Sequence, residues 1–359
     1  MATADYWSDA DLKALTYGGL INEDVMQKIW NISQIPLPFT DAVGIGMPIK
    51  ATPYSWTTDS QASVDLTNAL VDGADATGNQ AAGGARVQNH AQISDKVVTV
   101  TERASAVDTI GRANELAYQL GMRQRDLRRD IEAIALTGQA SVADNGDSTA
   151  GKVAGFSAWL TSNDYNGTSG AATGFNTSTG VVAAVTVGET RVLLTDTYLK
   201  ACVESVYLNN GNPSVLMSRP ELIARLNKFI IGSPTSMGIA TPTANVSGQG
   251  AGVEQTAQGY VNVIVTDFGF TLKLVPNRLQ QAYTSADTPT ADSSCDVFLI
   301  DTGMVELAYL IPEHTETLGK AGTADKRQIS AQWGMRVMDE KAHGVIRDID
   351  PTGTVAASA

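Results

Sequence analysis

Residues 105–138 read SAVDTIGRANELAYQLGMRQRDLRRDIEAIALTG, and this stretch decides the fold. Apolar side chains recur in it at steps of three and four residues, the spacing of one face of an α-helix. They are Ile110, Ala113, Leu116, Ala117, Leu120, Leu127, Ile131 and Ile134. We expect one helix over residues 105–137, with Asp108 in its first turn and Gly138 as its C-cap. At 1.5 Å per residue it would be about 45–50 Å long, more than a compact domain requires.

A basic cluster lies on this helix. Its members are Arg123, Arg125, Arg128 and Arg129. The simpler interpretation is a solvated helix face, with ion pairs from Arg128 and Arg129 to Glu132. The functional alternative is a charge network between subunits, or a contact with nucleic acid. Residues 103–152 carry equal numbers of acidic and basic residues, whereas the whole chain has a net charge of −13.

The residues before the helix lack a core of their own. Residues 1–40 read as an arm, with weak helical spacing over 11–30 and an extended path at Pro36 and Pro38. Tyr54–Thr58 and Ile93–Thr101 have the composition of strands, and the Gly/Ala/Asn-rich stretch 72–92 lies between them. We expect a long two-stranded excursion with a flexible tip. A ribbon of this kind is marginal in water alone and needs a partner surface.

The residues after the helix predict a mixed α/β unit. The Gly/Ser/Thr/Asn-rich stretch 139–190 is a candidate domain boundary. A helix over 195–208, a buried strand over 215–218 and a helix over 221–230 with Ser218 as a candidate cap follow. Strands are expected at 261–265, 270–275 and 297–300, then at 304–311, 328–337 and 342–349. The low-charge tract 233–259 reads as a loop and residues 351–359 as a disordered tail.

Composition excludes several classes of protein. Two cysteines, Cys202 and Cys295, cannot form a disulfide framework or a zinc site, and three histidines are few for a metal centre. The acidic start MATADYWSDADLKAL lacks the basic and apolar regions of a signal peptide, and no run of about 18 apolar residues suggests a membrane span. We therefore expect a soluble protein kept in a reducing compartment, with no cofactor and no metal.

Motifs with catalytic associations are weak here. Residues 146–152, GDSTAGK, match a phosphate-binding loop but follow a helix and lack the hydroxyl residue after Lys152. Residues 144–147, DNGD, lack the closing Glu of a calcium loop. His90, His314 and His343 have no second ligand at helical spacing. His314 with Glu313 or Glu316 is the one arrangement that could serve acid–base chemistry.

Four short phrases give the chain a family resemblance. They are RASAV at 103–107, ELAYQ at 115–119, DIEAI at 130–134 and EKAHG at 340–344. Together with the order of arm, ribbon, long helix and α/β unit, they resemble the SU10-type major capsid proteins of tailed bacteriophages. The resemblance covers about residues 1–350. It implies an α+β, HK97-like capsid fold.

The resemblance implies a division of the chain. Residues 1–40 would be the N-terminal arm, 41–102 the extended loop (E-loop) β-hairpin, and 103–190 a peripheral domain with a spine helix. Residues 191–310 would form a mixed α/β axial domain, 311–350 the return strands of the peripheral domain, and 351–359 the tail.

The function implied is a non-enzymatic major capsid protein. Copies would self-assemble through hexamers and pentamers into an icosahedral or prolate head shell around phage double-stranded DNA. The virion would form in the host bacterial cytoplasm without contacting a membrane, each E-loop lying across a neighbour. Arg123, Arg125, Arg128 and Arg129 would face another subunit or weakly contact packaged DNA. A scaffold, a portal and a decoration protein are candidate partners.

Two other functions stay open at this point. A secreted or surface binding module of the adhesin type would account for the Gly/Ser/Thr/Asn-rich loops, although no signal peptide is visible. A hydrolase would use His314 with Glu313 or Glu316.

Overall fold

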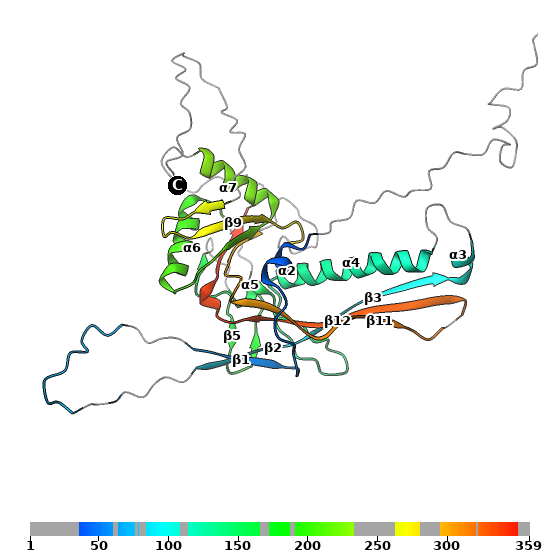
Figure 1. The fold of residues 1–359 in the computed structure, drawn as a ribbon, viewed down its shortest axis with the longest axis horizontal. Helices are drawn as coiled ribbons and strands as arrows, with labels where there is room; N and C mark the ends of the chain where they lie inside the picture. Colours follow the sequence, from blue (N-terminus) through cyan, green and yellow to red (C-terminus); the bar gives the residue numbers. More distant parts are fainter. Residues whose placement is uncertain are drawn as a thin grey trace, which may run out of the picture.

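The computed structural model describes residues 36–59, 64–75, 78, 84–107, 114–165, 172–186, 191–232, 263–280, 295–320 and 322–350, with the backbone alone for 227–232. The described chain has two main parts (Figure 1). A long three-stranded sheet with a helix along it forms the right half of the view, and a six-stranded sheet with two helices forms the upper left. A narrow ribbon leaves the body at the lower left.

The long helix is shorter than the sequence predicts. Helix α4 spans Glu115–Ala135, 21 residues, because the Asn114 side chain caps it by accepting from the Ala117 amide at 3.0 Å. Residues 102–106 form a separate helix, α3 (Glu102–Ala106), which ends at the extended backbone of Val107. The expected single helix over 105–137 is therefore wrong at its start, and α4 is about 31 Å long. Asp108 lies outside the described residues.

The end of α4 also differs from the prediction. The helix is capped at Leu136 rather than at Gly138, because the amides of Leu136 and Thr137 turn back to the carbonyls of Ala133 and Ile134. The Thr137 hydroxyl also donates to the Ile134 carbonyl at 2.7 Å. Because the helix ends in this tight turn, Gly138 does not act as its C-cap.

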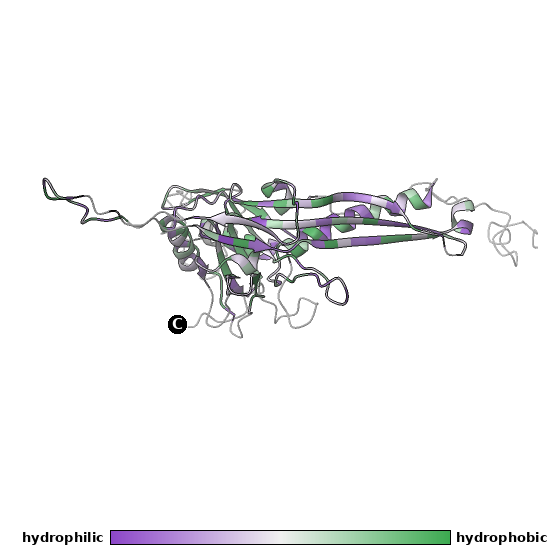
Figure 2. Ribbon diagram, turned by 90° about the horizontal axis from the view of Figure 1, so that it is seen from below, coloured by the Kyte–Doolittle hydropathy of each residue, from purple (hydrophilic) through white to green (hydrophobic). Residues whose placement is uncertain are grey.

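The helix α4 packs along a sheet in the order β11-β12-β3, which Figure 2 shows as three long strands side by side. Strands β3 (Gln92–Thr101), β11 (Val305–Thr317) and β12 (Ala324–Val337) are all antiparallel to their neighbours. Val98 and Val100 on β3 are buried with Leu127 and Ile131 of α4. The strands predicted at 93–101, 304–311 and 328–337 are thus confirmed, and all three are longer than predicted.

The ribbon pairs differently from the prediction. Strand β1 (Tyr54–Thr58) has the predicted bounds, but its partner is β2 (Ala85–Asn89) rather than the strand at 93–101. Strand β2 lies inside the Gly/Ala/Asn-rich stretch 72–92, for which the sequence predicted no strand. The base of the ribbon belongs to the core, because Tyr54 is buried and donates to the Met335 carbonyl at 2.8 Å. Only the part beyond it projects from the body.

The second sheet has the order β4-β13-β10-β7-β9-β8. Its strands are β4 (Asp164–Tyr165), β13 (Gly344–Ile349), β10 (Cys295–Ile300), β7 (Val215–Ser218), β9 (Thr271–Pro276) and β8 (Val263–Val265). Helix α6 (Asp196–Leu208) contacts β4 and β13, and α7 (Pro220–Gly232) contacts β9. Every residue of β7, β10 and β13 is buried, as expected for strands covered on both faces.

Two details of this sheet correct the sequence-based expectations. Strand β13 belongs to the six-stranded sheet, not with the return strands β11 and β12 to which residues 344–349 were assigned. Ser218 does not cap α7, because its hydroxyl donates to the Asp296 carbonyl at 2.9 Å.

Residues 139–160 do not form a boundary between domains. Val153, Phe156 and Leu160 are fully or almost fully buried in one cluster with Leu127 and Trp333. The short helix α5 (Phe156–Trp159) lies in this cluster together with α2 (Pro38–Val43). The small elements β5 (Phe175–Asn176), β6 (Val181–Val182) and the 3-10 turn η1 (Glu340–Ala342) complete the described chain. One core thus joins the two sheets.

Two predicted segments, the helix at 11–30 and the loop at 233–259, lie outside the described residues, as does the tail 351–359.

Candidate assembly surfaces

The histidines do not form a catalytic group among the described residues. His343 is completely buried, and burial lowers its pKa to about 4; burial also lowers the pKa of His90. His314 is partly exposed, with Nε2 3.3 Å from the Glu316 carboxylate. Glu313 instead accepts from Arg128 at 2.9 Å, so it is engaged away from His314. His314 and Glu316 therefore form a solvent-accessible contact on the surface rather than an acid–base pair inside a cleft.

The other chemistry-bearing motifs are structural. Burial raises the pKa of the Cys202 thiol and raises that of Cys295 to about 12, so both remain protonated thiols. The GDSTAGK stretch is a turn closed by a bridge between Val142 and Lys152. The Asn145 side-chain oxygen, within DNGD, accepts hydrogen bonds from three backbone amides of that turn. This oxygen is therefore already engaged in the turn itself. No cluster of His, Cys, Asp and Glu suited to a metal occurs in the part of the chain that the structure describes.

The four arginines do not share one environment. Arg123 and Arg129 both pair with Asp126, at 3.1 and 3.8 Å. Arg128 reaches across to Glu313 on β11. Arg125 is exposed and has no ion-pair partner among the described residues. The predicted Arg128–Glu132 and Arg129–Glu132 pairs are wrong, because Glu132 points into the core.

Glu132 is a buried structural side chain that the sequence pattern placed on the surface. Its carboxylate is fully buried and accepts from the amides of Phe39 and Thr40, at 2.7 and 2.8 Å, and from the Thr40 hydroxyl at 2.6 Å. The Asn277 side-chain amide donates a fourth bond at 2.7 Å. One side chain therefore joins α4, the start of α2 and the end of β9. Four donors satisfy a buried carboxylate without a cation.

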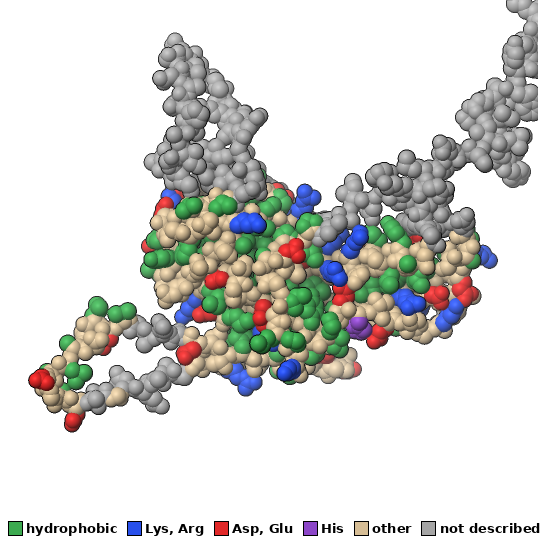
Figure 3. Space-filling model, viewed as in Figure 1, with side chains coloured by type: hydrophobic (Ala, Val, Ile, Leu, Met, Phe, Trp, Pro, Cys, Tyr) green, Lys and Arg blue, Asp and Glu red, His purple; other side chains and the backbone are tan. Residues whose placement is uncertain are grey.

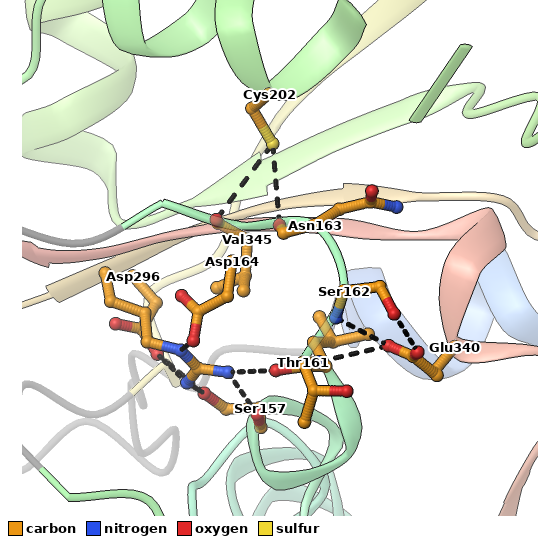
Figure 4. Close-up of polar contacts among 11 residues, drawn as sticks. Ser157, Thr161, Ser162, Asn163, Asp164, Cys202, Asp296, Glu340 and Val345 are labelled. Atoms are coloured by element: carbon orange, nitrogen blue, oxygen red, sulfur yellow. Dashed lines mark hydrogen bonds and ion pairs between the residues drawn. The ribbon is translucent and has the colours of Figure 1, made fainter. Parts of the chain in front are cut away.

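A second buried polar network holds the six-stranded sheet to α5 (Figure 4). The Arg347 guanidinium, on β13, donates to Asp164 at 2.9 Å and to the carbonyls of Ser157 and Leu160 at 2.6 and 2.8 Å. Asp296 lies 3.7 Å away and accepts from the Ser157 hydroxyl at 2.8 Å. Burial raises the pKa of Asp296 to about 6, although the Arg347 charge opposes that shift.

The ribbon tip, residues 64–75, exposes large apolar side chains. They are Val64 (85% exposed), Leu66 (92%), Leu70 (70%) and Val71 (80%). Figure 3 shows them at the far end of the ribbon beside acidic side chains. Residues 59–84 carry four aspartates and neither lysine nor arginine. The tip is thus both apolar and acidic.

A hollow lies between α2, α4 and β11, and we name it the arm–helix groove. Its volume is about 690 Å³, and its lining combines apolar side chains with the acidic side chains of Asp41 and Glu313; the apolar ones include Leu37, Ile45, Pro48, Ile131, Tyr309 and Pro312. Ile45 is 70% exposed there. Arg128 stands at its edge, with Gln124 one turn before it.

An aromatic patch lies at the other end of the molecule. Tyr207, near the end of α6, stacks on Phe268 with ring centroids 5.1 Å apart and meets Phe270 edge-on at 5.7 Å. Leu208 beside it is exposed. Tyr207 and Leu208 lie at the end of α6, whereas Phe268 and Phe270 come from the turn between β8 and β9.

None of the helices in the described ranges combines the length and apolar character needed to cross a bilayer.

Comparison with known proteins agrees with this geometry. A family model described as the SU10 major capsid protein matches residues 9–350. The major capsid protein of Escherichia phage Phieco32 is 28% identical over 328 residues, which cover 89% of this chain and 91% of the phage protein.

Solved structures show the same fold. The capsid subunit of Cyanophage A-1(L) has a TM-score of 0.58 at 13% identity, covering 92% of this chain and 98% of its own. The SrpI encapsulin of Synechococcus elongatus has a TM-score of 0.52 at 12% identity, covering 94% and 96%. The α+β architecture is therefore the HK97-like fold that the sequence resemblance implied.

Proposed function

The chain belongs to the SU10 major capsid protein family, and on this premise we propose that many copies of it form the shell of a phage head around double-stranded DNA. It is a structural protein of the virion, and its association with itself is its function. Both alternatives, an adhesin-like module and a hydrolase using His314, lack support from the family match or from the described residues.

The observation that carries this proposal is the projecting ribbon. An isolated soluble subunit rarely keeps four large aliphatic side chains on an extended tip in water. The base of the same ribbon is fixed, because Trp56 donates to the Val337 carbonyl at 3.0 Å and packs on Trp159. A rigidly mounted apolar tip suits a contact with another molecule.

We retain the expected division of the chain with one change. The three-stranded sheet and α4 form the peripheral unit, and the six-stranded sheet with α6 and α7 forms the axial unit. Strand β13 then counts with the axial unit, since it pairs with β10. The arm (1–40) and the ribbon excursion (41–102) are the extensions that reach neighbouring copies.

The remaining parts of the proposal concern partners. The net charge of −13 favours a container whose wall does not hold packaged DNA tightly. The basic cluster on α4 would supply a weak local contact. Assembly in the bacterial cytoplasm, with a scaffold, a portal and a decoration protein as candidate partners, fits this role. Enzymatic activity has no place in it.

Expression of the whole chain in bacteria, followed by negative-stain microscopy, tests the function. We expect closed shells or capsomer-sized rings, with or without a co-expressed scaffold. A chain that remains monomeric or dimeric under every assembly condition would contradict the proposal. Shell formation by the control variant Lys200→Ala, which removes only exposed pairs with Asp196 and Asp267, should be unchanged.

A further inference from the structure

The buried network around Arg347 holds more carboxylates than cations (Figure 4). The carboxylates of Asp164 and Asp296 both face its single guanidinium. The side chains of all three residues are at most 9% exposed. One carboxylate suffices to match the guanidinium, so the second is a buried negative charge in excess. Such a charge is unfavourable unless it is paired or neutralised.

The two carboxylates are not held equally. Asp164 accepts a hydrogen bond from Arg347 Nε at 2.9 Å. The Asp296 carboxylate is 3.7 Å from the guanidinium and accepts instead from the Ser157 hydroxyl at 2.8 Å. A neutral hydroxyl stabilises an ionised carboxylate less than a charged donor does. Asp296 is therefore the carboxyl group that this site favours in its protonated form.

The surroundings of Asp296 favour the same form. Besides Arg347, the charged groups that face it are Asp164 of β4 and Asp348 of β13, and both are acidic. Helix α5 and strand β7 contain no charged residue. Burial, reinforced by the two neighbouring carboxylates, raises the pKa of Asp296, and burial also raises the pKa of Asp164.

Two acceptor atoms at this site lack a donor. The Gln280 side chain donates through Nε2 to the Asp296 carbonyl at 2.7 Å, but its Oε1 atom is buried and has no hydrogen-bond partner among the described residues. The same is true of Asp164 Oδ1. An ionised carboxylate can only accept, whereas a protonated one also donates. A bound proton would therefore supply a donor where the site has unused acceptors.

We propose that Asp164 and Asp296 bind one proton between them at mildly acidic pH, and that this proton tightens the contact of the six-stranded sheet with α5. With the proton bound, one guanidinium faces one negative charge. Without it, two carboxylates compete for the guanidinium that also holds the carbonyls of Ser157 and Leu160. The two carboxyl groups titrate as a coupled pair.

The site lies where several elements meet. Arg347 is on β13, Asp164 on β4 and Asp296 on β10, and all three strands belong to the six-stranded sheet. Helix α5 lies in one apolar cluster with residues of α4 and β12. The proton thus acts on the contact between the six-stranded sheet and the core beneath the long sheet. This is a property of the single subunit and is separate from its assembly into a shell.

The proton stabilises this contact on the acidic side. The pKa of Asp296 is about 6 in the folded chain against an ordinary value of 3.8, so the folded state keeps a proton that the unfolded chain has lost. The stabilisation is complete below the ordinary value and is lost as pH rises through about 6. Over the whole range the equilibrium constant for opening should increase about a hundredfold.

NMR of the whole chain, labelled with carbon-13 at the aspartate carboxyl groups, tests the shared proton. Asp164→Asn and Asp296→Asn assign the two resonances. In the wild type we expect both to follow a titration step near pH 6, above that of exposed aspartates. Asp164→Asn removes a neighbouring negative charge and should lower the Asp296 midpoint by about one pH unit or more. Asp147→Asn, in an exposed turn, is the matched control and should leave it unchanged.

Hydrogen exchange of the amides of residues 156–160 measures the contact itself. After correction for the intrinsic exchange rate, these amides should be about tenfold more protected at about pH 5 than at about pH 7.5. Asp296→Asn imitates the uncharged acid, so its protection should be the same at both pH values.

Either of two results would overturn the proposal. Carboxyl carbons of Asp164 and Asp296 that both titrate like those of exposed aspartates would show that no proton is held. Equal protection of α5 at the two pH values in the wild type would show that the proton does not govern the contact. If Asp164→Asn fails to fold, the wild-type titration and Asp296→Asn still decide the matter. Neither result bears on shell formation, which is measured separately.

Discussion

The Glu132 carboxylate accepts a hydrogen bond from the backbone amide of Phe39 at 2.7 Å, across 93 positions of sequence. Through this bond, and those from Thr40 and Asn277, the point where the arm enters the body is tied to the long helix. The Phe39 ring beside it packs on Phe156 at 5.7 Å. One buried side chain therefore holds residues 39 and 40 of α2 against the long helix.

Replacing Glu132 should destabilise the subunit strongly. Glu132→Ala leaves several buried donors without an acceptor, and we expect a loss of ~3 kcal/mol in the free energy of unfolding. Glu132→Gln keeps one carbonyl oxygen and should lose ~1–2 kcal/mol. Urea unfolding of unassembled subunits measures both. Asp130→Asn, two residues before Glu132 at a half-exposed pair with Lys96, is the control and should change stability by under ~0.5 kcal/mol. Equal effects at positions 130 and 132 would contradict the anchoring role.

Asp296 and His343 should give opposite pH dependences. Burial raises the pKa of Asp296 to about 6, above its unfolded value of 3.8, so the folded state binds the extra proton and stability falls as pH rises from about 4 to 6. Burial lowers the pKa of His343 from 6.5 to about 4, so its unfolded state binds the extra proton and stability rises with pH over about 4 to 6.5.

Unfolding midpoints at several pH values would separate these two effects. Relative to the wild type, the stability of the Asp296→Asn variant should increase more steeply as pH rises. The stability of the His343→Gln variant should increase less steeply. Asp147→Asn, in an exposed turn, serves as the control and should follow the wild-type profile. Parallel profiles for all four proteins would show that neither buried group titrates as described.

The thiols should be inert in the native protein. Because burial raises the pKa of both Cys202 and Cys295, a thiol-specific reagent at pH 8 should label them about a hundredfold more slowly than in denaturant. Mass spectrometry after timed labelling reads out each cysteine. Rapid labelling in folded protein would mean that α6, for Cys202, or strand β10, for Cys295, readily separates from the elements packed on it.

Charge reversal on α4 should impair assembly while leaving the fold intact. Arg128→Glu with Arg129→Glu sets like charges beside Glu313 and Asp126, and both arginines are partly exposed, so folding is little affected. We expect particle yield or DNA retention to fall by about tenfold or more. Circular dichroism checks the fold and microscopy counts full particles. Lys200→Glu on α6 is the matched reversal, and normal full particles from the α4 variant would refute an assembly role.

The elements that the sequence predicted well are those with a local pattern. Strands β1 and β7 have the predicted bounds, and α6 begins after Thr195, whose side chain accepts from Tyr198. Strand β2 was missed because its residues ARVQN look polar, and its partner β1 is distant in the sequence, with Tyr54 paired to Asn89. Local pattern does not reveal a partner of that kind.

The candidate site was predictable only in part. The arginines were found because they are clustered in sequence, but their environments depend on distant residues such as Glu313. Glu132 was assigned to surface ion pairs because it sits one turn from Arg128 and Arg129. Its actual donors come from positions 39, 40 and 277. Arg347 gave no signal either, since its partners lie 51 to 190 residues away.

The two chain segments that connect the three-stranded and six-stranded sheets are hydrogen-bonded to each other. The chain passes from β10 to β11 through residues 301–304 and returns from β12 to β13 through residues 338–343. The Met338 amide donates to the Met304 carbonyl at 2.8 Å, and the Asp301 amide donates to His343 Nδ1 at 3.1 Å. Because the two short connecting segments are hydrogen-bonded to each other, they hold the two sheets together. We therefore expect the two sheets of one subunit to move together as one body, so that any change in the angle between neighbouring copies takes place at the contacts between them.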